Sequence, residues 1–198
     1  LNLMPADADT GVVFHRIDIH DKDNAVPAIW DRVVDTRMCT SIGNDDGVTV
    51  GTIEHLMATL SAFGIDNVIV KINSSELPAL DGSSYEYVKK IVNTGIKVQH
   101  QKKSIFKILK KVEVKNGDRF ISIAPSDELS INISINYPKT IIGSSQYFYE
   151  HSKDSFIKNL SMARTYTLLK DVEKMRTAGL AIGGNLNNAI VVDKYQIL

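Results

Sequence analysis

Apolar positions in the first half of the chain follow strand spacing and helix spacing in turn. Runs rich in β-branched and aromatic residues predict strands over 10–19, 25–36 and 67–73. Before the last of these, Thr52 is placed to cap a helix that ends at Gly64. Apolar residues recur in that helix at intervals of three and four: Ile53, Leu56, Met57, Leu60 and Phe63.

A second helix is predicted after the loop "ELPALDGSS". Ser83 and Glu86, three residues apart, form a capping box, and Gly95 fits the helix end. The apolar positions of this helix are Tyr87, Val88, Ile91 and Val92. The polar stretch "KVQHQKKS" (97–104) follows and is typical of a domain linker.

The second half repeats the order of strands and then helices. Asn116-Gly117 predicts a hairpin, and the alternating residues 129–137 predict a strand with its apolar side chains facing one way. Helices are expected around 153–160 and 166–177, and the last eleven residues read as a strand. We therefore expect an α+β fold of two duplicated domains, each a β-sheet packed against helices, over residues 1–97 and 104–198.

Composition narrows the possible classes of protein. Lys plus Arg and Asp plus Glu number 23 each, so the charge balance gives no attraction to nucleic acid or to an anionic membrane. The single cysteine, Cys39, excludes a disulfide framework and fits a reducing compartment. No apolar run approaches the ~20 residues of a transmembrane helix. Because the chain opens on Leu1 in a strand-like run, we expect it to be an internal fragment of a longer protein.

The pair Glu54-His55 is the clearest candidate for chemistry. A helix N-terminus favours a carboxylate, and the adjacent imidazole could bind zinc if two further ligands came from elsewhere. Glu54 would then be placed as a base for a zinc-bound water. A glutamate in a first helical turn is also common for capping and dipole reasons alone, so both interpretations stay open.

The remaining histidines and the cysteine offer little support for a metal site. His15 and His20 lie near a strand end among aspartates, a pattern typical of a solvated surface. His100 and His151 lie in a linker and a charged loop. Cys39 fits a small buried hydrophobe better than a nucleophile, because no histidine is close in sequence to activate it. The sequence therefore offers one plausible metal ligand rather than three.

Several stretches together resemble one family, the zinc-dependent UDP-3-O-acyl-N-acetylglucosamine deacetylases of lipid A biosynthesis. They occur in the family's order over nearly the whole chain: "MPADADTGVVFHR", "DTRMCTSI", "TIEHLMATLSAFGIDN", "ELPALDGSS", "SMARTYTLL", "GLAIGG" and "NAIVVD". The resemblance implies two domains of the same fold with the active site between them. It also implies a cytoplasmic hydrolase with zinc as cofactor, which removes the N-acetyl group from a UDP-acyl-sugar.

The resemblance assigns roles to particular residues. It implies that His55 binds zinc, that Glu54 is the general base, and that Thr165 donates a hydrogen bond to the reacting carbonyl oxygen. Arg119 and Tyr137 take positions that contact the diphosphate and the nucleotide end. The other implied substrate-binding residues are Tyr166 as a second aromatic site, Val172, Leu180, Ala181, Ile182 and Val191 along an acyl passage, and Met38 and Cys39 near its mouth.

Two departures from the family pattern limit what the resemblance implies. Arg37 and Leu168 differ from the residues expected there, which leaves the acyl-chain preference and the nucleotide contacts open. The family's other zinc ligands, a His and an Asp, and the histidine that protonates the leaving amine come after residue 198, and its first strand precedes residue 1. We therefore expect the whole protein to be a deacetylase and the 198-residue piece alone to be inactive.

Two other classes of function remain as alternatives. The chain could be a non-catalytic module that binds a sugar nucleotide or an acyl group, which retention of Arg119, Tyr137 and the apolar insert would favour. A nucleic-acid-binding module of similar architecture is a third option, and the even charge balance counts against it.

Overall fold

Strands and helices form a mixed α+β structure in the computed structural model, which describes residues 1–198. A four-stranded sheet in the first half has the order β1-β7-β2-β3, in which β2 and β7 are parallel and the other pairs are antiparallel. An antiparallel sheet of β4, β5 and β6 and two helices complete this half. The elements are β1 (Asn2–Pro5), β2 (Val12–Arg16), β3 (Ala25–Pro27), the 3₁₀ turn η1 (Trp30–Arg32), β4 (Val33–Asp35), β5 (Ser41–Gly43), β6 (Thr49–Val50), α1 (Glu54–Ala62), β7 (Val68–Ile72) and α2 (Tyr85–Thr94).

The second half consists of two antiparallel hairpins followed by short helices and a parallel strand pair. β8 pairs with β9, β10 with β11, and β12 with β13. The elements are β8 (Val112–Asn116), β9 (Arg119–Ile123), β10 (Ser130–Tyr137), β11 (Gly143–Glu150), α3 (Lys153–Ser155), the π-helical turn η2 (Phe156–Leu160), β12 (Tyr166–Leu168), α4 (Leu169–Thr177) and β13 (Ile190–Val192). None of the helices combines the length and the apolar character needed to cross a membrane.

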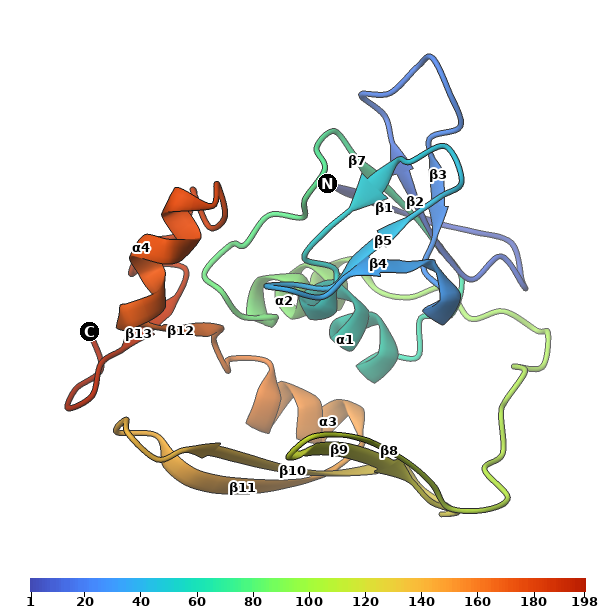
Figure 1. Ribbon diagram of the computed structural model, residues 1–198. Coiled ribbons are helices and arrows are strands. Elements are labelled where there is room, and N and C mark those ends of the chain that lie inside the picture. The colour runs from blue at the N-terminus through green and yellow to red at the C-terminus, as the bar shows by residue number, and fades with distance from the viewer.

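Helices α1 and α2 lie in the middle of the molecule (Figure 1). The strands of the first half lie on one side of them, and α3 with the β8–β11 hairpins lies on the other. A connection without regular secondary structure (residues 95–111) runs down one side and joins the two halves. The sheets and helices of the predicted α+β class are confirmed, whereas the duplication of two domains remains a prediction.

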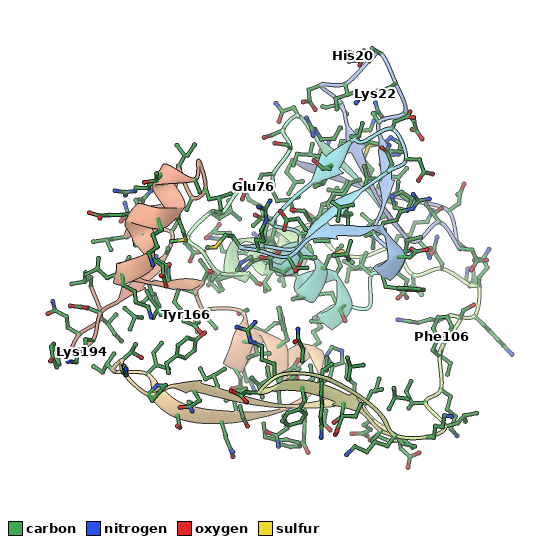
Figure 2. All side chains as sticks on the ribbon, viewed as in Figure 1. His20, Lys22, Glu76, Phe106, Tyr166 and Lys194 are labelled. Carbon is green, nitrogen blue, oxygen red and sulfur yellow. The ribbon has the colours of Figure 1, made fainter.

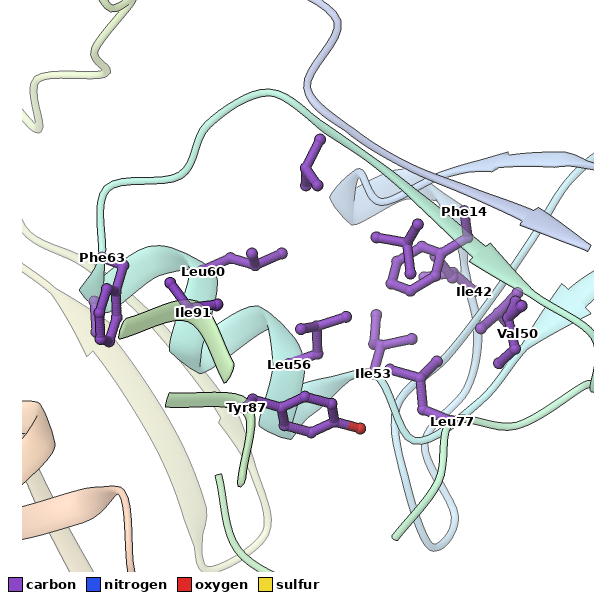
Figure 3. Close-up of a cluster of buried hydrophobic side chains, with 14 of the residues drawn as sticks. Phe14, Ile42, Val50, Ile53, Leu56, Leu60, Phe63, Leu77, Tyr87 and Ile91 are labelled. Carbon is purple, nitrogen blue, oxygen red and sulfur yellow. The ribbon is translucent and has the colours of Figure 1, made fainter. Parts of the chain in front are cut away.

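One hydrophobic cluster contains residues from both halves of the chain. It contains 19 buried residues, among them Leu56 of α1, Phe14 of β2 and Val70 of β7, each 0% exposed. Figure 3 shows how the helix side chains meet the strand side chains in this core. Tyr149 and Phe156 of the second half belong to the same cluster. The two halves are therefore packed together through shared apolar burial, the main source of folding free energy.

Helix α1 has the predicted extent, but Thr52 does not cap it. Thr52 has a φ of 57°, in the left-handed region, and its hydroxyl donates to the Glu76 carboxylate instead of accepting from the helix. The N-cap is Ile53, which makes no side-chain cap bond. Gly64, with a φ of 63°, takes the left-handed position after the helix, as predicted.

Helix α2 is also confirmed, whereas its capping box is wrong. The Ser83 hydroxyl donates to Asp81 and accepts from the N–H of Tyr85. Glu86 forms an ion pair with Lys89 instead of reaching back to the helix start. The local turn at Asp81 competes for Ser83, which is why the expected reciprocal pair does not form.

Three other predicted elements have different boundaries. The strand expected over 25–36 is interrupted by η1, so that β3 and β4 belong to different sheets. The helix expected over 166–177 begins at Leu169, because residues 166–168 pair with β13 as a strand. The hairpin at Asn116-Gly117 forms, but Asn116 pairs with Arg119, so the two loop residues are Gly117 and Asp118.

The alternating strand over 129–137 is present as β10. Ile131 and Ile133 of this strand are 41% and 52% exposed, and Leu129, immediately before it, is 56% exposed. Alternation therefore predicted the strand correctly, while the apolar face of this hairpin is left largely uncovered.

Candidate active site

The candidate base, Glu54, is held at the N-terminus of α1. Its Oε2 accepts a hydrogen bond of 3.1 Å from the N–H of Thr40. Thr40 also holds the helix start, because its carbonyl accepts from the N–H of Ile53 at 3.4 Å. The helix dipole favours a negative charge at this end. The carboxylate is thus fixed by one oxygen, and Oε1 has no hydrogen-bond partner within the chain.

Cys39 and Met38 lie in the loop immediately before Thr40. Cys39 is half-buried, and its Sγ is 3.6 Å from the Ser41 Oγ. Met38 is 52% exposed. The buried cysteine favoured by the sequence is therefore only partly buried. Met38 and Cys39 directly precede Thr40, the residue that anchors Glu54.

His55 is fixed by its main chain and not by its ring. Its carbonyl oxygen accepts from the Thr59 hydroxyl at 2.9 Å and from the Ser84 hydroxyl at 3.1 Å. The half-buried imidazole makes no hydrogen bond within the chain. A neutral imidazole with both nitrogens uncommitted can act as a metal ligand.

The residues of this chain do not fit a complete catalytic metal site. A catalytic zinc needs three protein ligands. No group of three His, Cys, Asp or Glu side chains is arranged to hold a metal ion among residues 1–198. His55 is thus a single candidate donor, and residues 1–198 alone do not assemble a catalytic zinc centre.

Main-chain hydrogen bonds hold Thr165 to two other segments of the chain, one at Gly82 and one at Ile190. Its N–H donates to the Gly82 carbonyl at 2.8 Å, and its own carbonyl accepts from the N–H of Ile190 at 2.9 Å. The side chain is exposed, and its hydroxyl makes no hydrogen bond within the chain. The candidate oxyanion donor is therefore fixed in place while its hydroxyl remains free.

Arg164 and Gly82 complete this meeting of three segments, which we call the junction (residues 81–84, 161–165 and 186–190). Arg164 Nε donates to the Asp81 carbonyl at 2.7 Å, and its Nη2 donates to the Leu186 carbonyl at 3.0 Å. Gly82, with a φ of 83°, lies so close to Asn188 that a Cβ would be 2.9 Å from the Asn188 carbonyl carbon. The close approach of these main chains therefore depends on the absence of a side chain at Gly82.

The sequence reasoning missed Arg164 and Gly82 as parts of the site. Both occur in stretches that carry the family resemblance, "SMARTYTLL" and "ELPALDGSS". The available signal was the tendency of Asp81-Gly82 to form a turn, which was interpreted only as a loop before a helix. Contacts between main-chain atoms of distant segments do not require particular side chains, so the sequence does not indicate them.

The candidate aromatic residue for the nucleotide end, Tyr137, and the second aromatic site, Tyr166, are brought together. The Tyr166 hydroxyl donates to the Tyr137 hydroxyl at 3.0 Å, and the ring centroids are 6.0 Å apart in an edge-to-face arrangement. Figure 2 shows Tyr166 reaching from β12 toward the end of the β10–β11 hairpin. Burial and this hydrogen bond raise the pKa of Tyr166 to about 12. Arg119 is exposed on β9 and has no hydrogen bond to this pair.

The residues expected along an acyl passage differ in exposure. Three of them are half-buried: Val172 of α4, Val191 of β13, and Leu180, which lies between these two elements. Ala181 has a φ of 52°, and Ile182 is 80% exposed. Their role in binding an acyl chain remains a prediction.

Comparison with known proteins places the sequence of this chain in one family. Residues 1–198 match the family described as UDP-3-O-acyl N-acetylglycosamine deacetylase (LpxC). The chain belongs to this family. A relative in the deacetylase family from Nautilia profundicola, named UDP-3-O-acyl-N-acetylglucosamine deacetylase, is 43% identical over 198 residues. Relatives of the same name from Actinobacillus succinogenes and Campylobacter jejuni are each 40% identical, over 200 and 198 residues.

The deacetylase relatives are longer than this chain. All of the chain is aligned in each comparison, and it spans 66% of the relative from Nautilia profundicola and 65% of that from Actinobacillus succinogenes. The family resemblance inferred from the ordered stretches is therefore confirmed over the whole of the 198 residues.

Proposed function

We propose that the whole protein hydrolyses the N-acetyl amide of a UDP-3-O-acyl-N-acetylglucosamine, releasing acetate and a free amine in the cytoplasm during lipid A biosynthesis. The observation that carries this proposal is Glu54, anchored through one oxygen at the start of α1 beside His55. The chain's membership of the deacetylase family supports the same reaction.

In this proposal Glu54 is the general base. Its Oε2 is occupied by the Thr40 N–H, while Oε1 is available to take the proton of an attacking water. A positioned base of this kind contributes about 10²–10⁴-fold to the rate. The anchored oxygen limits rotation of the carboxylate, so the free oxygen keeps its direction relative to the helix.

Thr165 would stabilise the oxygen that becomes negative as water adds to the amide carbon. Its hydroxyl is free, and its main chain is fixed by Gly82 and Ile190. A donor that is already in place when charge develops gives more stabilisation than one that must reorient.

We propose zinc as the cofactor of the whole protein, with His55 as one ligand, because the family resemblance implies it. The other ligands would come from outside residues 1–198. The division of the chain into domains over 1–97 and 104–198, with the site between them, belongs to the same proposal.

Substrate recognition would use two groups of side chains. Tyr137 would contact the nucleotide end, with Tyr166 beside it as a second aromatic site and Arg119 at the diphosphate. The acyl chain would lie along an apolar passage, whose proposed lining residues are Met38, Cys39, Val172, Leu180, Ala181, Ile182 and Val191.

The test is acetate release by the full-length protein and its Glu54→Gln variant. A matched control is Glu86→Gln, because Glu86 is the first-turn glutamate of α2 and pairs with Lys89. We expect Glu54→Gln to lose at least about 100-fold in kcat with its metal content unchanged, as is typical for removal of a general base. Glu86→Gln should keep the wild-type rate within a factor of about two, because it removes only an exposed ion pair.

Two results would contradict the proposal in different ways. A Glu54→Gln rate within about tenfold of wild type would remove the base assignment, since a base contributes more than this. Binding of the UDP-acyl-sugar without any acetate release by the wild type would support the non-catalytic binding module instead.

A further inference from the structure

We propose that Arg164 is a positioning residue, whose guanidinium fixes the junction and thereby sets the place of the Thr165 hydroxyl relative to Glu54 and His55. The inference rests on the proposed function, because it gives Thr165 a catalytic partner role. The hydrogen bonds of the Arg164 guanidinium go to main-chain carbonyls and not to Glu54.

The contacts of Arg164 hold two main chains that come from opposite halves of the molecule. Nε donates to the carbonyl of Asp81, 83 residues away, and Nη2 donates to the carbonyl of Leu186, 22 residues away. A planar guanidinium can serve two acceptors at once in a fixed geometry, which a lysine ammonium on a flexible stem cannot reproduce. The arginine therefore fixes the distance between the two segments that flank Thr165.

Those same two segments hold the main chain of Thr165. Gly82, next to Asp81, accepts from its N–H, and Ile190, four residues after Leu186, donates to its carbonyl. A shift of either segment would move Thr165 with it. Arg164 is the adjacent residue in the chain, so a single side chain controls both contacts of its neighbour.

The junction is also connected to α1. Ser84 donates through its N–H to the Ser161 carbonyl at 3.0 Å and through its hydroxyl to the His55 carbonyl at 3.1 Å. Ser84 and Ser161 are 7% and 0% exposed, so these bonds are shielded from water. A continuous set of hydrogen bonds thus links the His55 main chain with the segment that ends in Thr165. Through this link Arg164 would control the position of Thr165 relative to His55, and not the charge of the site.

The experiment measures steady-state acetate release by the full-length wild type and by Arg164→Gln, Arg164→Lys, Thr165→Val and the double variant Arg164→Gln/Thr165→Val. The matched control is Arg32→Gln, because Arg32 also donates two hydrogen bonds, both to Asp45, away from the junction. We expect Arg164→Gln to lower kcat about 10- to 100-fold with KM changed less than about threefold, since misplacement by about 1 Å can cost about 100-fold. Arg164→Lys should lose less, because its ammonium can still donate to one of the two main-chain carbonyls.

The double variant separates positioning from a general loss of structure. If Arg164 acts through Thr165, Arg164→Gln should lower kcat less than about threefold further once Thr165 is valine, because effects of residues that act as a unit are not additive. Equal losses in the two backgrounds would overturn the inference. So would a kcat for Arg164→Gln within about threefold of wild type. If the glutamine variant does not fold, the lysine variant takes its place in the cycle.

Amide hydrogen exchange of the same proteins, without substrate, keeps the inference distinct from the proposed function. The N–H groups of Thr165 and Ile190 are hydrogen-bonded in the junction, so Arg164→Gln should speed their exchange at least about tenfold, whereas Arg32→Gln should leave it unchanged. Unchanged exchange would overturn the positioning role whether or not the wild type releases acetate. A wild type that releases no acetate would contradict the proposed function, and the exchange result alone would then decide whether Arg164 fixes the junction.

Discussion

Replacing Gly82 by alanine should destabilise the protein more than replacing a glycine of similar backbone conformation. Gly82 has a φ of 83°, and an added Cβ would overlap the carbonyl oxygen of Asn188 and lie 2.9 Å from its carbonyl carbon. The Thr165 Cγ2 would be a third neighbour at 3.3 Å. Two of these three atoms belong to the main chain, so no side-chain rotation can relieve the overlap.

The expected loss in free energy of unfolding for Gly82→Ala has two parts. Left-handed backbone costs about 1–2 kcal/mol for a residue with a Cβ. Forcing extra volume into a packed site typically costs about 1–3 kcal/mol more. Gly82→Ala should therefore lower the free energy of unfolding by about 2–5 kcal/mol, the sum of those two ranges.

The control is Gly64→Ala, which isolates the backbone part. Gly64 has a φ of 63° and no heavy atom within 4 Å of an added Cβ, so only the cost of about 1–2 kcal/mol applies. Urea unfolding of the full-length protein, followed by circular dichroism, gives both values. A Gly82→Ala effect no larger than that of Gly64→Ala would refute the close approach of Gly82 and Asn188.

Three further predictions concern the core, the pH dependence and the substrate. Leu56→Ala should lower the free energy of unfolding by about 2–5 kcal/mol in the same urea assay, because Leu56 is 0% exposed, while Val92→Ala, at 55% exposure, should change it by less than about 0.5 kcal/mol. Burial raises the pKa of Tyr87 from 10.0 to about 12. Between these values the folded state keeps a proton that the unfolded chain releases, so stability should fall as pH rises, and Tyr87→Phe should make that fall shallower in urea titrations. Arg119→Ala should raise KM for the UDP-acyl-sugar with kcat unchanged in steady-state assays, and an unchanged KM would remove it from the diphosphate site.

Local sequence rules predicted the elements whose signals come from their own residues. The period of apolar residues predicted α1 correctly, because Leu56 and Leu60 meet a core that their spacing implies. The same rules placed Thr52 at an N-cap that it does not occupy, because the Glu76 carboxylate, 24 residues away, accepts its hydroxyl. They also extended a helix through Tyr166, which pairs as a strand with Ile190. At Thr52 and at Tyr166 a partner distant in sequence outweighs the local preference.

In the candidate site, too, only part of the arrangement could be predicted from the sequence. Glu54 and His55 could be identified because their side chains carry recognisable chemistry at a helix start. The Thr40 N–H that holds Glu54, and the carbonyls that hold Arg164, are groups that nearly every residue possesses. Their use depends on tertiary structure, so no residue type indicates them in advance.

The main-chain attachment of Thr165 has a consequence for how this position can vary. Its N–H and carbonyl hold Thr165 in the junction, while the hydroxyl has no hydrogen bond within the chain. Serine or valine at this position would keep the same backbone bonds and the same chain path. Selection at this position can therefore act on reactivity almost separately from foldability, and changes here can be compared between homologues as changes in chemistry alone.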